Sequence, residues 1–145
     1  MAKSRIRKFR ESFLYAGRGL RLCITGERNF RVHMTAAFYV TAAAVMGHVT
    51  STEAAVLCLC FGLTMGAELM NTAVERLCDK TARGYDRMVR DAKDIAAAAV
   101  FVCAAACVAV GVCIFLMHGV LAAALRFFAA RLWLGMVFLV TAPAA

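Results

Sequence analysis

Long stretches without a charged side chain constrain this sequence more than any other feature. The segment Ile95–Met117 runs for 23 residues without a charge, enough for a helix to cross the roughly 30 Å hydrocarbon core of a bilayer. Hydrophobic residues make up 63% of the chain, above the roughly 45–50% typical of soluble domains. A soluble core of this size could not enclose so much apolar surface, so the sequence predicts an integral membrane protein.

Two further apolar runs predict two more transmembrane helices. Met34–Gly47, extended by Phe30–Val32, approaches the required length, and Ala54–Val74 forms the next run. The connecting loop GHVTSTE has no Lys or Arg, so we expect it on the outer side of the membrane. Within it, Ser51 or Thr52 is predicted to cap the following helix.

The two ends of the chain differ from this central part. Residues 4–26 are too polar to span a membrane, but their apolar side chains recur at intervals of four and seven, which predicts an amphipathic helix on the membrane surface. Residues 119–145 contain a short apolar stretch, for which we expect an extra helix. An interfacial helix, a short fourth span and a poorly ordered end remain open for it. The expected fold is therefore an all-α integral membrane protein, with an N-terminal amphipathic surface helix, three transmembrane helices and an extra C-terminal apolar helix. Residues 1–118 form the membrane domain, and residues 119–145 form an added segment without an assigned role.

The positive charge is concentrated beside the predicted spans. Of 17 basic residues, nine lie between Lys3 and Arg31 and six between Arg76 and Lys93. Such blocks mark the cytoplasmic side and anionic lipid headgroups, and no nucleic-acid-binding motif is present, so a nucleic-acid partner is not expected. The seven cysteines contain no CxxC pair and lie mostly in apolar runs, where small apolar packing residues are the expected role.

A row of acidic and amide side chains follows one face of the second predicted span. Glu68, Asn71, Glu75 and Asp79 are spaced by three, seven and eleven residues from the first, which places them within about 80° of one another on a helix. Along the helix axis, Glu68 and Glu75 are about 10 Å apart. An ionisable group inside an apolar run is costly, so Glu68 is predicted to be functional.

Two more groups are expected at the same boundary between membrane and cytoplasm. Glu27 lies just before the first span, and with Glu75 it would supply carboxylates from two helices, which suits Mg²⁺. Lys93 and Asp94 are predicted to stand where the third helix begins, and the helix N-terminus with Lys93 would favour an anion. For Asp94, a plain capping role and a ligand role remain open. The sequence has no P-loop and no protein-kinase motif set.

Three strings together resemble the prokaryotic diacylglycerol kinase family, and most closely its undecaprenol kinase branch. They are ERNFRVH from Glu27, AELMNTAVERLCD from Ala67, and AKDIAAAAV from Ala92. The resemblance covers roughly residues 8–117. It implies a multi-pass protein of the cell membrane that assembles as a homotrimer, with active sites between protomers on the cytoplasmic side.

The resemblance also implies roles for individual residues. Glu68 would be the catalytic base that accepts a proton from the lipid hydroxyl, and Asn71 would support the magnesium-binding cluster. Glu27 and Glu75 would hold the Mg²⁺ of MgATP. Asp79 would stand behind these groups. The remaining nucleotide contacts would come from Tyr15, Gly84, Tyr85, Asp86, Lys93 and Asp94.

The predicted activity is therefore the transfer of the γ-phosphate of MgATP to the hydroxyl of a membrane lipid, with undecaprenol as the expected acceptor. Diacylglycerol is the alternative acceptor for the same chemistry. A non-enzymatic small oligomeric membrane protein is the competing class, because Glu68 and Asn71 could instead line a pore or join helices. The segment Lys80–Tyr85 departs from the usual family pattern, and residues from about Gly119 onward extend beyond it.

Overall fold

A computed structural model describes residues 5–81, 84–119, 126 and 136, and this part of the chain is helical with no β-strand. Its four helices are α1 (Arg5–Gly26), α2 (Arg28–Met46), α3 (Ser51–Thr81) and α4 (Arg87–Met117). The predicted all-α fold is confirmed for the described residues. The proposed C-terminal helix within residues 119–145 lies almost entirely outside them.

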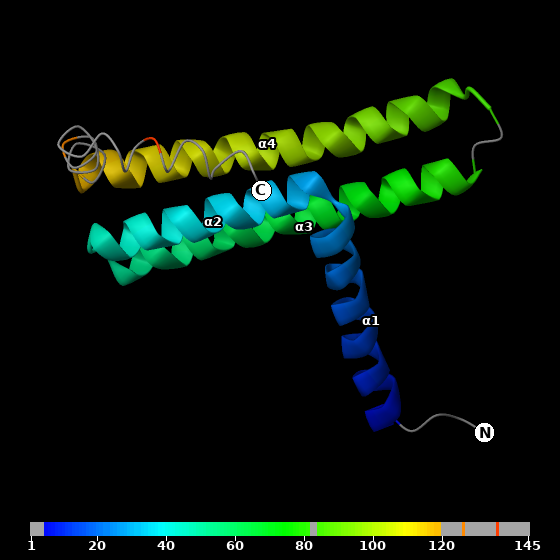
Figure 1. Ribbon diagram of the computed structural model, residues 1–145, viewed down its shortest axis with the longest axis horizontal. Helices are drawn as coiled ribbons and strands as arrows, with labels where there is room; N and C mark the ends of the chain where they lie inside the picture. Colours follow the sequence, from blue (N-terminus) through cyan, green and yellow to red (C-terminus); the bar gives the residue numbers. More distant parts are fainter. Residues whose placement is uncertain (1–4, 82–83, 120–125, 127–135, 137–145) are drawn as a thin grey trace.

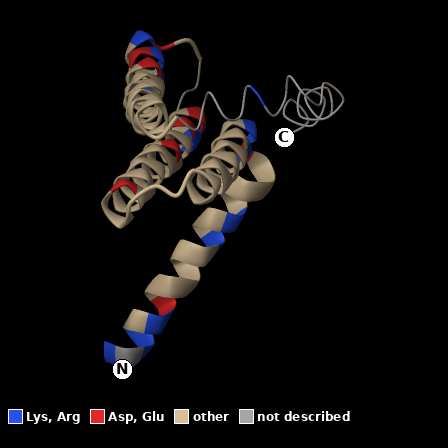
Figure 2. Ribbon diagram, turned by 90° about the vertical axis from the view of Figure 1, so that its left-hand side faces the viewer, with Lys and Arg blue, Asp and Glu red and all other residues tan. Residues whose placement is uncertain are grey.

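Helices α2, α3 and α4 form an elongated bundle, and α1 projects from it (Figures 1 and 2). The chain changes direction at Glu27, the single residue between the end of α1 and the start of α2. Its backbone is extended (φ −106°, ψ 117°). Helix α1 carries most of its charge as Lys and Arg (Figure 2). A helix therefore exists where residues 4–26 predicted one, while its position on a membrane surface stays a prediction.

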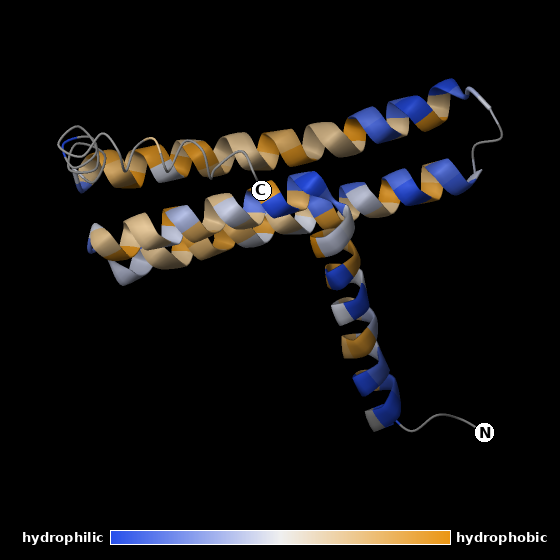
Figure 3. Cartoon of the chain, viewed as in Figure 1, coloured by the Kyte–Doolittle hydropathy of each residue, from blue (hydrophilic) through white to orange (hydrophobic). Residues whose placement is uncertain are grey.

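Helices α3 and α4 are the two described helices long and apolar enough to cross a membrane. Each has 31 residues, and their hydrophilic residues gather at the ends joined by the 82–86 connection (Figure 3). Helix α2 has 19 residues, but its first turns contain Arg28, Arg31 and His33, which shorten the apolar part. Membrane crossing by α2 therefore stays a prediction.

The contact between α3 and α4 combines apolar packing with buried polar side chains. Leu57 and Ile114 pack with Ala44 of α2 in a buried cluster. Farther along, the Cys107 thiol donates to the Cys60 carbonyl oxygen (3.1 Å) and lies 3.0 Å from the Thr64 hydroxyl. In an apolar surrounding, interhelical hydrogen bonds of this kind hold two helices in one register. These cysteines are free thiols that pack between helices, as predicted.

The end of α3 opposite the 82–86 connection begins with a capping box formed by Thr50 and Glu53. The Glu53 N–H donates to the Thr50 hydroxyl oxygen (3.3 Å), and the Thr50 N–H donates to a Glu53 carboxylate oxygen (2.8 Å). The predicted cap at Ser51 or Thr52 is therefore wrong by one or two residues. The reason is that Thr50 has its acidic partner three positions later.

Glu53 also connects the two long helices, because its carboxylate lies 2.8 and 2.9 Å from His118 Nε2 at the end of α4. A carboxylate only accepts hydrogen bonds, so Nε2 carries the donated proton. Glu53 precedes the apolar run of α3. Its pKa is lowered from 4.5 to about 2, first by the side-chain and backbone hydrogen bonds with Thr50 and then by the hydrogen bond with His118.

This lowered pKa predicts an acid-sensitive contribution to stability. A depressed carboxylate pKa stabilises the fold above about pH 4.5, and the contribution is lost as the pH falls toward about 2. Thermal unfolding in detergent between pH 5 and pH 2 should therefore depend more steeply on pH in the wild type than in a Glu53→Gln variant. Equal slopes would contradict the assignment.

Helix α4 begins at Arg87, earlier than the predicted start at Lys93 and Asp94. Asp86 is its N-cap, and the Asp86 carboxylate accepts a hydrogen bond from the Met88 N–H (2.8 Å). Asp94 thus lies two turns inside the helix, which removes the capping role from the two alternatives left open for it. The helix start does not lie beside Lys93 either, because Asp86 caps the helix at Arg87 and the first two turns, with Arg–Asp pairs spaced four residues apart, precede Lys93.

Candidate active site at the end of the bundle

The polar face of α3 runs from the packed interior of the bundle outward to solvent. Glu68 and Asn71 are buried, with 3% and 7% of their surface exposed, while Glu75 is half-buried and Asp79 is exposed. The periodicity of the sequence placed these side chains on one face. The structure adds that this face is turned toward the neighbouring helices rather than toward lipid at its inner end.

Glu68 stands among polar groups from two other parts of the chain. Its carboxylate interacts with His33 and Asn29 of α2 and experiences the negative charges of Glu75 and Glu27. A buried carboxylate is expensive unless polar partners compensate it, and two nearby carboxylates raise that cost further. Such an arrangement is typical of a functional group rather than of a structural one.

Glu27 reaches α3 from the corner between α1 and α2. As the residue that precedes α2 it could have capped that helix, but its side chain makes no capping hydrogen bond. Instead, its carboxylate oxygen lies 3.3 Å from Nη2 of Arg76, the residue after Glu75. The structure therefore brings Glu27 to the same end of α3 as Glu75, as the sequence predicted, within a single protomer.

Asn71 provides a further oxygen that is free to bind. Its amide nitrogen Nδ2 donates to Glu75 Oε1 (2.9 Å), which fixes the orientation of the amide. Among the described residues, Asn71 Oδ1 is a buried side-chain oxygen without a hydrogen-bond partner. Buried polar atoms are rarely left unpaired, so an orphaned oxygen beside carboxylates marks a place for a cation or a donor group.

These residues fit a magnesium ion that also binds phosphate. Mg²⁺ takes oxygen ligands and is usually held by one or two carboxylates plus substrate phosphates. Glu75 and Glu27 can supply the carboxylates, and Asn71 Oδ1 is an additional oxygen nearby. Among the described residues, no three His, Cys, Asp or Glu side chains are gathered closely enough to enclose a metal by themselves.

Lys93 and Asp79 connect α3 to α4 beyond this cluster. The Lys93 ammonium donates to Asp79 Oδ1, and this hydrogen bond, the largest of the contributing effects, raises the pKa of Lys93 above its ordinary value. Lys93 therefore stays positively charged at neutral pH. Of the predicted nucleotide contacts, Lys93 is the one that is hydrogen-bonded to Asp79 on the acidic face of α3.

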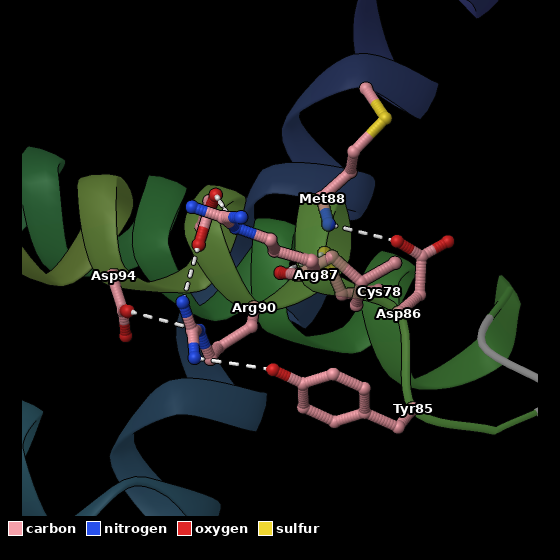
Figure 4. Close-up of polar contacts among 9 residues, drawn as sticks. Cys78, Tyr85, Asp86, Arg87, Met88, Arg90 and Asp94 are labelled. Carbon is pink, nitrogen blue, oxygen red and sulfur yellow. Dashed lines mark hydrogen bonds and ion pairs between the residues drawn. The ribbon is translucent and has the colours of Figure 1, made fainter.

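Arg90 organises the other predicted nucleotide contacts on α4 (Figure 4). Its guanidinium donates to the Tyr85 hydroxyl (3.2 Å) and to Asp91 (3.1 Å), and lies 4.0 Å from Asp94. Gly84 precedes Tyr85 in the same connection and is exposed. The structure thus brings Tyr85 and Asp94 together through Arg90, while the side chain of Asp86 is engaged as the helix cap.

Tyr15 is not brought to the acidic cluster within the protomer. It lies on α1 with 58% of its surface exposed, and Arg18 of the same helix covers its ring at 5.5 Å. Eleven residues separate it from Gly26, which is about 16 Å along the axis of α1. Its predicted contact with nucleotide therefore stays a prediction.

An apolar cavity of about 330 Å³ lies between α2, α3 and α4 next to the buried carboxylate. His33, which interacts with Glu68, lines it together with Thr64 and Met65 from the preceding turn of α3. The rest of the lining is mostly apolar and includes Val40, Phe61 and Val108. The cavity provides apolar space that ends close to Glu68.

Three residues of this site had no predicted role, namely Asn29, His33 and Arg76. Asn29 and His33 are four residues apart, so they share a face of α2, and that spacing is visible in the string ERNFRVH. Arg76 gave no such signal. Its partner Glu27 is 49 positions away in the chain, and only the fold places them together.

The fold and the site define a helical membrane protein with a carboxylate-rich site at one end of an apolar bundle. Comparison with known sequences makes this more specific. The model of the prokaryotic diacylglycerol kinase family matches residues 14–115 of the chain. The chain belongs to this family, as the resemblance of its three motifs predicted.

Two relatives illustrate the range of the family. The chain is 41% identical over 106 residues to a diacylglycerol kinase of Synechocystis sp. (72% of this chain, 61% of that protein). It is 33% identical over 114 residues to an undecaprenol kinase of Bacillus subtilis (79% of this chain, 93% of that protein). The aligned region thus spans less than two thirds of the Synechocystis relative. The two relatives are named for different lipid acceptors.

Proposed function

We propose that this protein is a lipid kinase that transfers the γ-phosphate of ATP to the hydroxyl of a membrane lipid. The observation that carries the proposal is the buried Glu68, which is surrounded by polar groups at the end of an apolar bundle and beside an apolar cavity. Membership of the prokaryotic diacylglycerol kinase family and the names of both relatives support the same activity.

In the proposed reaction, Glu68 accepts the proton of the lipid hydroxyl as the hydroxyl oxygen attacks the γ-phosphorus. The bond between the γ-phosphorus and the bridging oxygen breaks, and ADP leaves with the electron pair. Little covalent chemistry is required of the protein, so its main contributions are positioning and electrostatic stabilisation. The hydrogen bond from Asn71 Nδ2 orients the Glu75 carboxylate, and a hydrogen bond with Asn29 orients that of Glu68.

Glu27 and Glu75 are the residues that we propose to hold Mg²⁺, with Asn71 Oδ1 nearby. When bound, the ion neutralises charge on the phosphates. Lys93 and the part of α4 organised by Arg90 are proposed to face the rest of the nucleotide, which would lie along the hydrophilic ends of α3 and α4. These ends are predicted to face the cytoplasm, the compartment that supplies ATP.

We propose undecaprenol as the acceptor, with diacylglycerol as the alternative. The pattern ERNFR followed by His33 favours the undecaprenol branch. His33 interacts with Glu68 and is one of the residues that line the apolar cavity. Both lipids offer a hydroxyl at headgroup depth, so the preference rests on the branch pattern alone.

A phosphorylation assay with radiolabelled ATP and the two lipids, in detergent or in bilayers, tests the proposal. We expect Mg²⁺-dependent transfer of label to lipid, with a higher kcat/KM for undecaprenol. Faster labelling of diacylglycerol would overturn the choice of acceptor. If neither lipid is labelled and ATP is not consumed, the non-enzymatic class of membrane protein is favoured instead.

The family resemblance further predicts a homotrimer of multi-pass protomers with sites completed between neighbours. Tyr15 is the residue for which this matters most, because it belongs to α1, the helix that projects from the bundle (Figure 1). Cross-linking in bilayers tests the trimer directly. A monomeric protein that retains full activity would overturn this part of the proposal.

A further inference from the structure

Arg76 forms an exposed ion pair with a residue that the proposed function requires for another purpose. Its Nη2 atom lies 3.3 Å from Glu27 Oε1, and the side chains of Arg76 and Glu27 are 52% and 29% exposed. Exposed pairs of this kind contribute about 0–1 kcal/mol to stability. The pair is therefore too weak to be needed for holding α2 against α3, and it can open at little cost.

The Glu27 carboxylate cannot serve Arg76 and a divalent cation equally well. A guanidinium and Mg²⁺ on the same oxygens would repel each other, so cation binding by Glu27 favours release of Arg76. Once released, Arg76 remains next to Glu75 in the chain and at the hydrophilic end of α3. Its guanidinium is then within the region proposed for the phosphates.

The charge balance of the site requires additional positive groups. Glu27, Glu68, Glu75 and Asp79 bring four carboxylates to this end of α3, and a nucleotide triphosphate adds further negative charge. Lys93 is one compensating cation, but it is hydrogen-bonded to Asp79. Arginine binds phosphate oxygens with two parallel N–H donors, which makes Arg76 well suited to the remaining requirement.

We propose that Arg76 binds the phosphates of the nucleotide, and that its pair with Glu27 is the resting arrangement that opens when MgATP binds. This inference rests on the proposed function, because it takes Glu27 as a magnesium ligand. Arg76 thereby exchanges a carboxylate partner for a phosphate partner. The guanidinium of Arg76 therefore has an anionic partner both with and without nucleotide.

Binding of MgATP in the absence of lipid, measured by calorimetry on the detergent-solubilised full chain, tests the inference without turnover. Arg76→Gln should raise the Kd for MgATP about tenfold, the loss expected when a charge-assisted hydrogen bond is removed. Arg76→Lys keeps the charge but not the paired donors, and should fall between Arg76→Gln and the wild type.

Arg7→Gln is the matched control, since Arg7 also forms an exposed pair with a glutamate, Glu11, far from the site on α1. It should leave the Kd unchanged. If Arg76→Gln binds MgATP as well as the wild type or more tightly, Arg76 only competes for Glu27, and the inference is overturned. If the wild type itself does not bind MgATP, the proposed function fails, and the inference fails with it.

Discussion

Glu68→Gln is expected to abolish lipid phosphorylation while MgATP binding stays close to that of the wild type. Glutamine has the same shape as glutamate but cannot accept a proton, and a general base contributes about 10²–10⁴-fold to a rate. The magnesium ligands Glu27 and Glu75 are untouched by the change. The measurement is kcat with lipid and ATP, together with the Kd for MgATP without lipid.

The fold should survive this substitution. Glu68 is 3% exposed and lies near the charges of Glu75 and Glu27, so a neutral side chain relieves repulsion instead of creating it. The thermal midpoint of the variant is expected to equal or exceed that of the wild type. Glu53→Gln, at the other end of α3, is the control for activity. A Glu68→Gln enzyme with normal turnover would remove the base assignment.

Glu75→Gln is expected to weaken Mg²⁺-dependent binding of the nucleotide and to leave the proton transfer intact. Loss of a charged ligand should raise the Mg²⁺ concentration needed for half-maximal activity by at least tenfold, since even changes to the groups behind metal ligands cost 10–100-fold. The substituted side chain keeps an oxygen that can accept the hydrogen bond from Asn71 Nδ2, so the neighbouring amide stays in place.

A Mg²⁺ titration of ATP consumption at saturating lipid checks this prediction, and a second titration of ATP at high Mg²⁺ separates metal from nucleotide affinity. The variant should recover much of its rate when Mg²⁺ is in excess, whereas Glu68→Gln should not. A Mg²⁺ titration identical to that of the wild type would refute the role of Glu75.

The helices that carry the site were largely predictable. The two informative errors are the start of α4 and the cap of α3. The helical face that carries Glu68 and Asn71 follows from their spacing alone. The start of α4 was placed too late because the segment from Arg87 to Asp94 is highly charged, as loops often are. The signals for a helix were Asp86, which caps it, and the Arg–Asp pairs spaced four residues apart, a spacing that places both partners on one helical face.

The cap of α3 illustrates the same lesson on a smaller scale. Three consecutive hydroxyl side chains, Thr50, Ser51 and Thr52, stand at the start of this helix, and composition does not distinguish among them. Thr50 is the cap because Glu53 stands three positions later and returns a hydrogen bond to its backbone. A reciprocal pair therefore identifies a helix start better than the residue type does.

The sequence by itself determined that this chain is helical, that long parts of it are apolar enough for a membrane, and that a row of carboxylates lies on one face of α3. These properties depend on periodicity and composition, which are local. Only the tertiary structure decided that Glu27 meets Arg76 and that His33 and Asn29 of α2 surround Glu68. Those contacts join residues far apart in the chain, and they exist because packing turns the polar face of α3 toward α2 and the corner at Glu27.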